Sequence, residues 1–440
     1  MTTTSRNPAG ASGPIPSQQH SALPAEPAPI DATRWPDVAA VPDGKMRAAI
    51  ARRLFAGVAQ RLAVQVMLPD GAVSGAGKAG DPVMRLVRPD AFYRRLGASG
   101  LIGFGEAYMA GDWDSAELAA VLTVLARGLG RLIPAPLLGF RPPGSSRRPD
   151  SDAQDVAGSA RNNRLHYDRG NDMFAAFLDE TLTYSCALFG TGPDGLPAAS
   201  ADVLAGAQRR KVDAVLDLAG VREDTRLLEI GTGWGELAMR AGLRGAHVVS
   251  ITNSVEQHKL ALRRVAAAGL ADKVDIRLCD YREVTGQYDA VVSVEMIEAV
   301  GASYWPAYFT AIDRALAPGG RAALQAITMP HPQMLTTSRH HTWIDRYIFP
   351  GCLIPSLQAI EETVAGHTSL QIASARWMGP HYAQTLRIWG ERFDAAADRL
   401  GALGVDPVFQ RMWRFYLAYC EAGFRCGRLD VGQFLLVRPD

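Results

Sequence analysis

The chain has 440 residues, of which 48% are hydrophobic and 21% are charged, an ordinary composition for a folded protein of two or three domains. Lys and Arg number 46 against 45 Asp and Glu, so no overall basic excess points to nucleic acid as a partner. The five cysteines are odd in number and include no C-x-x-C pair. This usage argues against a disulfide framework or structural zinc and favours a reducing cytoplasm.

The first 34 residues are rich in Pro, Ser, Ala and Gly, lack an apolar core and are predicted to be a disordered tail. Apolar residues then recur at every fourth position from Met46, which predicts a basic amphipathic helix over 46–66. Such a helix fits either contact with a membrane surface or docking on the protein with a solvated face. The sequence offers no run of about 18 nearly uncharged apolar residues, the length a membrane span needs, so any contact with lipid is expected at the surface.

A small α+β domain is predicted over 35–140. The evidence is two strand-like runs, a compact segment rich in Gly and aromatic residues, and a helical stretch: "LAVQVMLP", "VMRLVRP", "AFYRRLGASGLIGFGEAYMAGDWD" and 116–132. Residues 141–163 combine Pro, Gly, Ser and charge without an apolar period and are predicted to be a linker.

From position 164 to the end, strand and helix patterns alternate. The strands are "TRLLEI", "HVVSIT", "VDIRLCD", "YDAVVSVE" and "RAALQAIT", and the helices cover 203–219, 254–268 and 304–316. This alternation predicts an α/β, Rossmann-like fold with a mostly parallel sheet. The late runs "SLQIASARW" and "QFLLVRP" are candidates for an antiparallel edge, and the helix-rich sequence before the end is predicted to be an insertion.

The segment "LLEIGTGWGELAMRAG" predicts a strand, a tight turn at Gly231, Gly233 and Gly235, and a helix whose N-terminus meets a ligand. A dinucleotide site would need a further glycine at position 236 and an acid at the end of the next strand, and the chain has neither. The G-x-G-x-G spacing after Glu229 resembles the nucleoside-binding turn of class I S-adenosylmethionine (SAM) methyltransferases.

Polar residues at the ends of the next two strands are candidates for the same cofactor site. They are Thr252, Asn253, Gln257, Asp280 and Tyr281. Two alternatives stay open, because Ser254 and Gln257 also have the spacing of a helix capping box and Asp280 is equally compatible with a plain strand-end acid.

Several segments together resemble the cyclopropane-fatty-acyl-phospholipid synthases and the related mycolic acid methyltransferases. They are "LHYDRGNDMFAAFLDETLTYSCALF", "VVSVEMIEAVGASYWPAYFTAIDRALAPGG", "HYAQTLRIWGERF" and "GLIGFGEAYMAGDWD". In "LQAITMPH" and "TWIDRYIFPGCLIPS" the chain is most similar to the actinobacterial branch that makes 10-methylene precursors of 10-methyl (tuberculostearic) fatty acids.

The resemblance implies methyl transfer from SAM to an acyl double bond, with Tyr184 and Ser185 beside the cofactor. It also implies a bound bicarbonate that serves as the base. The residues that match its site are Cys186, Glu298, Ile327, Tyr382 and, where the family has His, Gln325. Because Gln cannot relay a proton as His can, we expect a rearranged base and a methylene rather than a cyclopropane product.

Other expectations follow from the same resemblance. The substrate would be a membrane phospholipid with an unsaturated, oleoyl-type chain, met from the cytoplasmic face of the plasma membrane by the N-terminal domain. Saturating a methylene product needs a flavin- or NADPH-dependent reductase partner, and a homodimer is a candidate assembly. The alternatives are a true cyclopropane synthase and a non-catalytic lipid- or SAM-binding scaffold.

A carbocation on the acyl chain would be stabilised by aromatic faces in a closed apolar site. The candidates are Tyr184, Trp234, Trp305, Trp343, Tyr347, Phe349 and Tyr382. Cys186 lacks a fixed His partner and is not expected to be a nucleophile. His166 and Asp168 lack a third metal ligand, so no metal is expected, and His340 is expected at the surface or in a lid.

Overall fold

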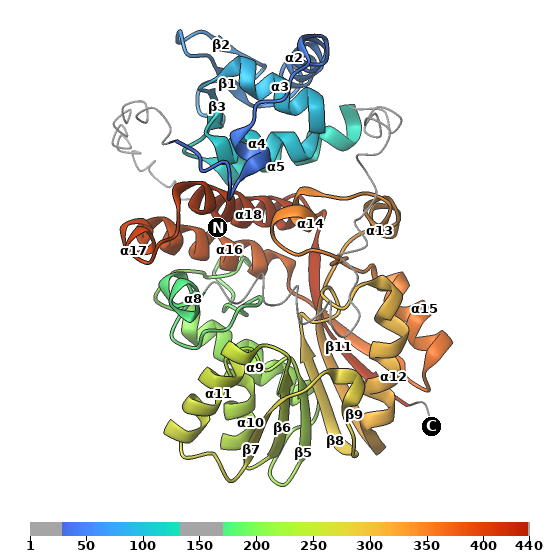
Figure 1. The fold of residues 1–440 in the computed structure, drawn as a ribbon. Helices are drawn as coiled ribbons and strands as arrows, with labels where there is room; N and C mark the ends of the chain where they lie inside the picture. Colours follow the sequence, from blue (N-terminus) through green and yellow to red (C-terminus); the bar gives the residue numbers. More distant parts are fainter. Residues whose placement is uncertain (1–28, 133–169, 439–440) are drawn as a thin grey trace, which may run out of the picture.

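The computed structural model describes residues 29–132 and 170–438, so the predicted linker and most of the predicted tail lie outside the described residues. Figure 1 shows three parts stacked on one another. An N-terminal region (blue) lies at one end, a layer of long helices (red and orange) follows, and a twisted sheet flanked by helices (green to red) forms the other end.

The N-terminal region combines helices with a small sheet in the strand order β2-β1-β3-β4. Its elements are α1 (Pro36–Ala39), α2 (Lys45–Ala59), β1 (Gln65–Met67), β2 (Val73–Ser74), β3 (Val83–Leu86), α3 (Pro89–Ser99), α4 (Leu101–Ala110), β4 (Trp113–Asp114) and α5 (Leu118–Leu132). Arg95 is buried at its centre, donates to Asp112 at 2.9 Å and donates to the carbonyls of Asp37, Val38 and Ala40. This one side chain therefore joins α3 to the turn between α4 and β4 and to the first helix.

The predicted helix over 46–66 is shorter in the structure, because α2 ends at Ala59 and residues 65–67 pair with β3 as a strand. The helix docks through small residues, with Ala48, Ala51 and Ala59 buried. The larger apolar residues Met46, Ile50 and Leu54 are 76%, 54% and 53% exposed. These three residues of the apolar stripe are thus largely exposed rather than packed in the core.

The second sheet has seven strands in the order β10-β11-β9-β8-β5-β6-β7. The strands are β5 (Arg226–Ile230), β6 (His247–Thr252), β7 (Val274–Leu278), β8 (Tyr288–Val294), β9 (Leu316–Thr328), β10 (Gln371–Trp377) and β11 (Asp430–Val437). The strands from β7 to β9 are parallel, whereas β11 and β10 are antiparallel. The predicted fold class, the parallel strands and the antiparallel edge are confirmed; β9 begins earlier than predicted and includes the "LAPGG" turn sequence.

Helices cover both faces of this sheet, as Figure 1 shows. One face packs on α9 (Leu204–Leu218), α10 (Glu236–Leu243) and α11 (Val255–Ala267), and the other on α12 (Trp305–Ala315) and α15 (Leu357–His367). Neighbouring residues of β5 alternate between the two cores, with Leu227 on one side and Leu228 on the other. Two short 3-10 helices, η2 (Tyr281–Glu283) and η3 (Ala302–Tyr304), follow β7 and β8.

The middle layer closes the carboxyl end of the sheet. It contains α8 (Asn171–Phe177), α13 (His331–Ser338), α14 (Trp343–Tyr347), α16 (Gly379–Ala395), α17 (Ala397–Ala402) and α18 (Pro407–Arg425). Asp406, just before α18, forms an ion pair with Arg34 at 2.9 Å, and Arg411 of α18 donates to the carbonyl of Tyr108 at 2.6 Å. Tyr347 donates to the buried Glu106 at 2.8 Å. The N-terminal region is therefore fastened to this layer by polar contacts as well as by packing.

Candidate active site

The predicted glycine turn follows β5 and opens α10. Gly231, Gly233 and Gly235 have φ angles of 99°, 54° and 91°, a region that residues with a Cβ seldom adopt. A Cβ on Gly231 would also lie 2.6 Å from the side chain of Met296. The strand, turn and helix are confirmed, and the turn needs glycine for both conformation and space.

The turn forms one wall of a cavity with a volume of about 1470 Å³. Pockets for a single ligand commonly measure about 300–1,000 Å³, so this cavity has room for a cofactor and a second molecule. Its wall includes the five strand-end residues Thr252, Asn253, Gln257, Asp280 and Tyr281. From there the cavity continues past α14 and α18 and reaches α2, α3, α4 and α5 of the N-terminal region.

The strand-end residues also have structural partners. Thr252 Oγ1 donates to Gln257 Oε1 at 2.9 Å, and the main chain of Gln257 donates to Ser254 Oγ at 3.3 Å as a helix cap. The carboxylate of Asp280 accepts two hydrogen bonds from Arg282, at 2.7 and 2.8 Å. Burial opposes ionisation of Asp280, but these hydrogen bonds outweigh it and lower its pKa. Both roles that the sequence left open for these residues are compatible with the structure.

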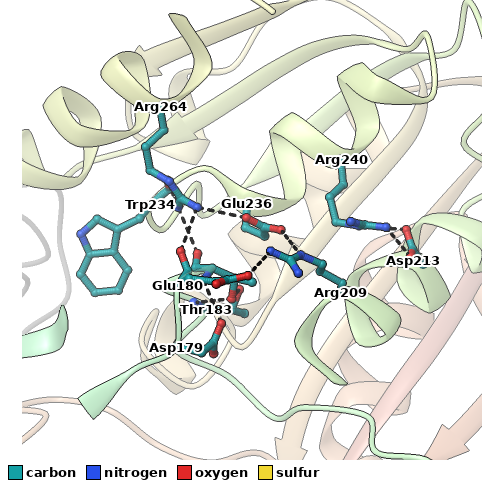
Figure 2. A network of polar contacts seen from close by, with 10 residues as sticks. Asp179, Glu180, Thr183, Arg209, Asp213, Trp234, Glu236, Arg240 and Arg264 are labelled. Atoms are coloured by element: carbon teal, nitrogen blue, oxygen red, sulfur yellow. Dashed lines mark hydrogen bonds and ion pairs between the residues drawn. The ribbon is translucent and has the colours of Figure 1, made fainter. Parts of the chain in front are cut away.

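A network around Arg264 of α11 ties the glycine turn to the 179–186 loop, as Figure 2 shows. The guanidinium donates to the carbonyls of Trp234 at 2.7 Å and Thr181 at 3.0 Å, and pairs with Glu236 at 3.1 Å. Beside it, Arg209 of α9 donates to Glu180 at 2.6 Å. The loop that carries Tyr184, Ser185 and Cys186 is therefore held firmly against the turn.

Three predicted site residues converge on a carboxylate that the sequence did not single out, that of Glu295. Glu295 Oε1 accepts hydrogen bonds from the main-chain N–H of Cys186 at 2.9 Å and from Gln325 Nε2 at 2.7 Å. Its Oε2 accepts one from the hydroxyl of Tyr382 at 2.6 Å. Groups that the family resemblance assigns to bound bicarbonate thus bind a side chain of the protein itself.

Glu295 follows β8 directly, and its φ of 52° lies in the left-handed region. That conformation is uncommon for a residue with a long side chain and is often found at functional sites, where the surrounding structure holds it. The sequence did contain a signal, because ligands in such folds bind at the carboxyl ends of parallel strands. Glu295 is the first acid after the strand, and the prediction chose the second, Glu298.

Glu298 lies beside this cluster but has different partners. Its Oε1 accepts from the main-chain N–H of Ile327 at 2.5 Å, and its buried Oε2 has no hydrogen-bond partner within 29–132 and 170–438. Burial and the charge of Glu295 raise the pKa of Glu298 to about 8. Burial raises the pKa of Glu295 too, but there hydrogen bonds from Tyr382 and Cys186 and the charge of Lys211 oppose the rise. At neutral pH, Glu295 is therefore the better candidate for a proton acceptor.

Of the neighbouring loop residues, Tyr184 and Ser185 line the cavity, whereas Cys186 is not part of its wall. The hydroxyl of Tyr184 shares a hydrogen bond of 2.9 Å with that of Tyr416, and Ser185 Oγ accepts from Lys211 Nζ at 2.6 Å. Burial, with the charge of Glu295, raises the pKa of the Cys186 thiol well above its ordinary value, so the thiol stays protonated. Cys186 contributes its main-chain N–H to the site, and its thiol is unsuited to act as a nucleophile.

Among the aromatic candidates, Trp305 and Tyr347 lie outside the cavity wall. Those that line it are Tyr184, Trp234, Trp343, Phe349 and Tyr382. His340, which was expected at the surface or in a lid, lines it as well and is half-buried. His166 and Asp168 fall outside the described residues, and within 29–132 and 170–438 no group of three His, Cys, Asp or Glu side chains could hold a metal ion.

A mostly parallel sheet with a glycine turn after β5, polar strand ends and a large cavity beside them is the arrangement of a class I SAM-dependent methyltransferase. The profile of the family described as mycolic acid cyclopropane synthetase matches residues 154–434, and the chain belongs to this family. The predicted family, fold class and dependence on SAM are thereby confirmed.

Named relatives make the similarity more specific. The chain is 54% identical over 414 residues to the tuberculostearic acid methyltransferase of Mycobacterium tuberculosis, which covers 93% of this chain and 97% of that protein. It is 32% identical to the cyclopropane-fatty-acyl-phospholipid synthase of Escherichia coli, over 83% of this chain and 90% of that one. A solved cyclopropane synthase from Mycobacterium tuberculosis is 29% identical, covers 63% of this chain and 97% of its own, and superposes with a TM-score of 0.57.

The pKa of Glu229 predicts how SAM binding depends on pH. Glu229 lines the cavity at the end of β5, and burial raises its pKa to about 8 against the hydrogen bond from Ser250. SAM carries a positive sulfonium, which favours the ionised form of a nearby carboxyl group. Binding should therefore release a proton below pH 8, and affinity should rise between pH 6 and 8. Calorimetry of SAM binding in two buffers of different ionisation heat measures the number of protons released. Glu229→Gln should abolish the release. If the wild type and the variant release the same number of protons, the proton comes from a group other than Glu229.

Proposed function

We propose that this enzyme transfers a methyl group from SAM to the double bond of an oleoyl-type chain in a membrane phospholipid and forms a 10-methylene product. The similarity to a tuberculostearic acid methyltransferase supports the product class. The observation that carries the chemistry is the carboxylate of Glu295, held by three hydrogen bonds inside the cavity.

The reaction needs a base close to the transferred carbon. SAM supplies an electrophilic methyl group, and its addition to the alkene leaves a carbocation on the neighbouring chain carbon. A hydride shift then moves the cation to the carbon that carries the new methyl group. Loss of a proton from that methyl group gives the exocyclic methylene, with the C–H electron pair forming the new double bond. Glu295 is the residue we assign to accept this proton.

A separate bicarbonate does not fit this arrangement. The N–H of Cys186, the amide of Gln325 and the hydroxyl of Tyr382 already donate to Glu295, and the N–H of Ile327 donates to Glu298. The donors that would hold the anion are therefore occupied by carboxylates of the chain. Glu295 takes the place of the external base, and Gln325 holds it in position as a neutral donor.

The cavity suits an acyl chain. Beyond the Glu295 cluster its wall is formed by apolar and aromatic residues of the middle layer and the N-terminal region, among them Phe349, Trp343, Phe415, Phe104 and Leu125. Aromatic faces near the reacting carbons stabilise a cation, and an apolar wall keeps out the water that would quench it.

The same cavity reaches the exposed apolar stripe of α2, where Ile50 and Leu54 line it. Leu101, at the start of α4, also lines the cavity there and is 51% exposed. Exposed apolar side chains next to basic ones are typical of a helix that lies in a membrane interface. We therefore assign this end of the cavity as the entrance for an acyl chain from the inner face of the plasma membrane. None of the described helices is long and apolar enough to cross a membrane.

The direct test is product analysis. Purified protein is incubated with SAM and dioleoyl phospholipid vesicles, and the fatty acids are separated by gas chromatography and identified by mass spectrometry. A 10-methylene chain is expected, and a reductase partner would then be needed for the saturated methyl branch. A cyclopropane product, which has the same mass, would favour the cyclopropane synthase alternative. SAM binding without any product would favour the alternative of a non-catalytic lipid- or SAM-binding scaffold. The prediction that the protein forms a homodimer is independent of this experiment.

A further inference from the structure

Lys211 of α9 is a buried cation that lines the same cavity as the proposed base. Its side chain is only 1% exposed, yet it forms part of the cavity wall together with Ser185, Glu229 and Glu295. Lysine is almost never fully buried unless its charge is compensated. Its ammonium donates to the neutral hydroxyl of Ser185, which does not balance the positive charge, so compensation has to come from other groups around it.

The side chain of Lys211 holds the loop that supplies Cys186. Lys211 Nζ donates to Ser185 Oγ at 2.6 Å, and one turn earlier Gln208 donates to the carbonyls of Ser185 at 2.9 Å and Thr183 at 3.3 Å. The next residue along the loop is Cys186, whose N–H donates to Glu295. One face of α9 thus fixes the direction of a hydrogen bond to the carboxylate.

The main chain of Lys211 reaches the same carboxylate by a second route. Its carbonyl accepts from Gln433 Nε2 at 3.2 Å, and the same Gln433 amide donates to Gln325 Oε1 at 3.1 Å. This contact orients the amide of Gln325 so that its Nε2 donates to Glu295. Two of the three hydrogen bonds to Glu295 are therefore positioned through Lys211.

Charge links the two residues as well. Burial lowers the pKa of Lys211, and among the groups that oppose this, Glu295 acts most strongly, ahead of Cys186, Asp179 and Glu229. In return, the charge of Lys211 opposes the rise that burial causes in the pKa of Glu295. The other titratable groups facing Glu295 are Tyr382 and Cys186, both held protonated, and Glu298.

We propose that Lys211 is a positioning residue of the reaction. Its ammonium is the buried counter-charge that keeps Glu295 ionised. Its contacts orient the hydrogen-bond donors of Cys186 and Gln325 toward that carboxylate. This inference rests on the proposed role of Glu295 as the base. It assigns a task to a buried cation that otherwise has none in the methyl transfer.

The test is the pH dependence of kcat in Lys211→Gln, which removes the charge but keeps a donor for Ser185. Without the counter-charge Glu295 should bind its proton more tightly. The fall of kcat on the acid side of the pH profile (its acid limb) should then occur about one pH unit higher, which is the lower end of the effect of a nearby opposite charge. Ser185→Ala is the matched control: it keeps the charge and removes the hydrogen bond, so it should lower kcat at every pH without moving that limb. An acid limb that stays in place in Lys211→Gln would overturn the proposal.

A second measurement reads the protonation state of Glu295 in the wild-type protein and needs no Lys211 variant. Infrared difference spectra between the wild type and Glu295→Gln report the protonated carboxyl group of Glu295 as pH changes. An ionised Glu295 at pH 7 supports the counter-charge, and a protonated one refutes it. If Glu295→Gln retains wild-type kcat, the proposed base is wrong; if it is inactive while Lys211→Gln leaves the limb unmoved, only the role of Lys211 is wrong.

Discussion

Glu295→Gln is expected to lower kcat by about 10³-fold, within the range found when a positioned general base is removed. The substituted side chain has nearly the same shape and can still accept hydrogen bonds, but its amide does not take up a proton at neutral pH. Methyl transfer itself does not need the base, so SAM affinity should stay within a few-fold of the wild type. The measurement is product formation per enzyme under saturating SAM and lipid, with calorimetry for SAM binding.

Glu298→Gln is the matched control, because both acids lie in the same cavity three positions apart. Glu298 is mostly protonated at neutral pH, given its pKa of about 8, and it holds the N–H of Ile327. A neutral amide in its place should therefore cost much less activity than the change at Glu295. The opposite ranking, with Glu298→Gln inactive and Glu295→Gln active, would return the role of base to the residue that the sequence predicted.

Much of the fold could be predicted because the secondary structure that neighbouring residues favour is the one that the folded protein adopts. Strand β5, the glycine turn and α10 are specified by neighbouring residues, since the positive φ angles at Gly231, Gly233 and Gly235 require glycine wherever the sheet lies. The order of strands and helices from β5 to β9 follows from periodicity in the same way. These are the elements in which sequence and structure coincide.

Glu295 could not be chosen over Glu298 in this way. The two acids stand in one short segment, and their roles differ because Glu295 adopts a positive φ and meets donors from three distant places: Cys186, Gln325 and Tyr382. Periodicity carries no information on that convergence. The hydrogen bonds and charges that separate their pKa values likewise depend on packing between β8, β9 and α16.

Helix α2 illustrates a different limit. Its sequence has two faces that could both be buried, one of small alanines and one of larger apolar residues, and hydrophobic spacing favours the second. The structure buries the alanines instead, which lets α2 approach α3 closely: a Cβ on Gly97 would lie 2.7 Å from the carbonyl oxygen of Arg47. The larger residues are left exposed beside the mouth of the cavity.

That exposed stripe leads to the second large expected effect. Met46→Glu combined with Ile50→Glu should weaken binding to anionic dioleoyl vesicles by about 10²-fold. Burying a large apolar side chain completely contributes about 1.5–3 kcal/mol, and the membrane would bury the exposed part of each, 76% of Met46 and 54% of Ile50. The added carboxylates also repel an anionic surface. Cosedimentation with vesicles measures the loss, and added salt should weaken wild-type binding because arginines flank the stripe.

Leu243→Glu supplies the control, since Leu243 is 70% exposed at the end of α10. Figure 1 shows α10 beside the seven-stranded sheet, at the opposite end of the molecule from α2. This variant should leave vesicle binding unchanged. The double variant should also regain much of its activity on oleoyl lipid dispersed in detergent, because its Glu295 cluster is intact and only delivery from a bilayer is impaired. Equal vesicle binding by the wild type and the double variant would show that α2 is not the membrane contact, and the acyl chain would then have to enter the cavity from another side.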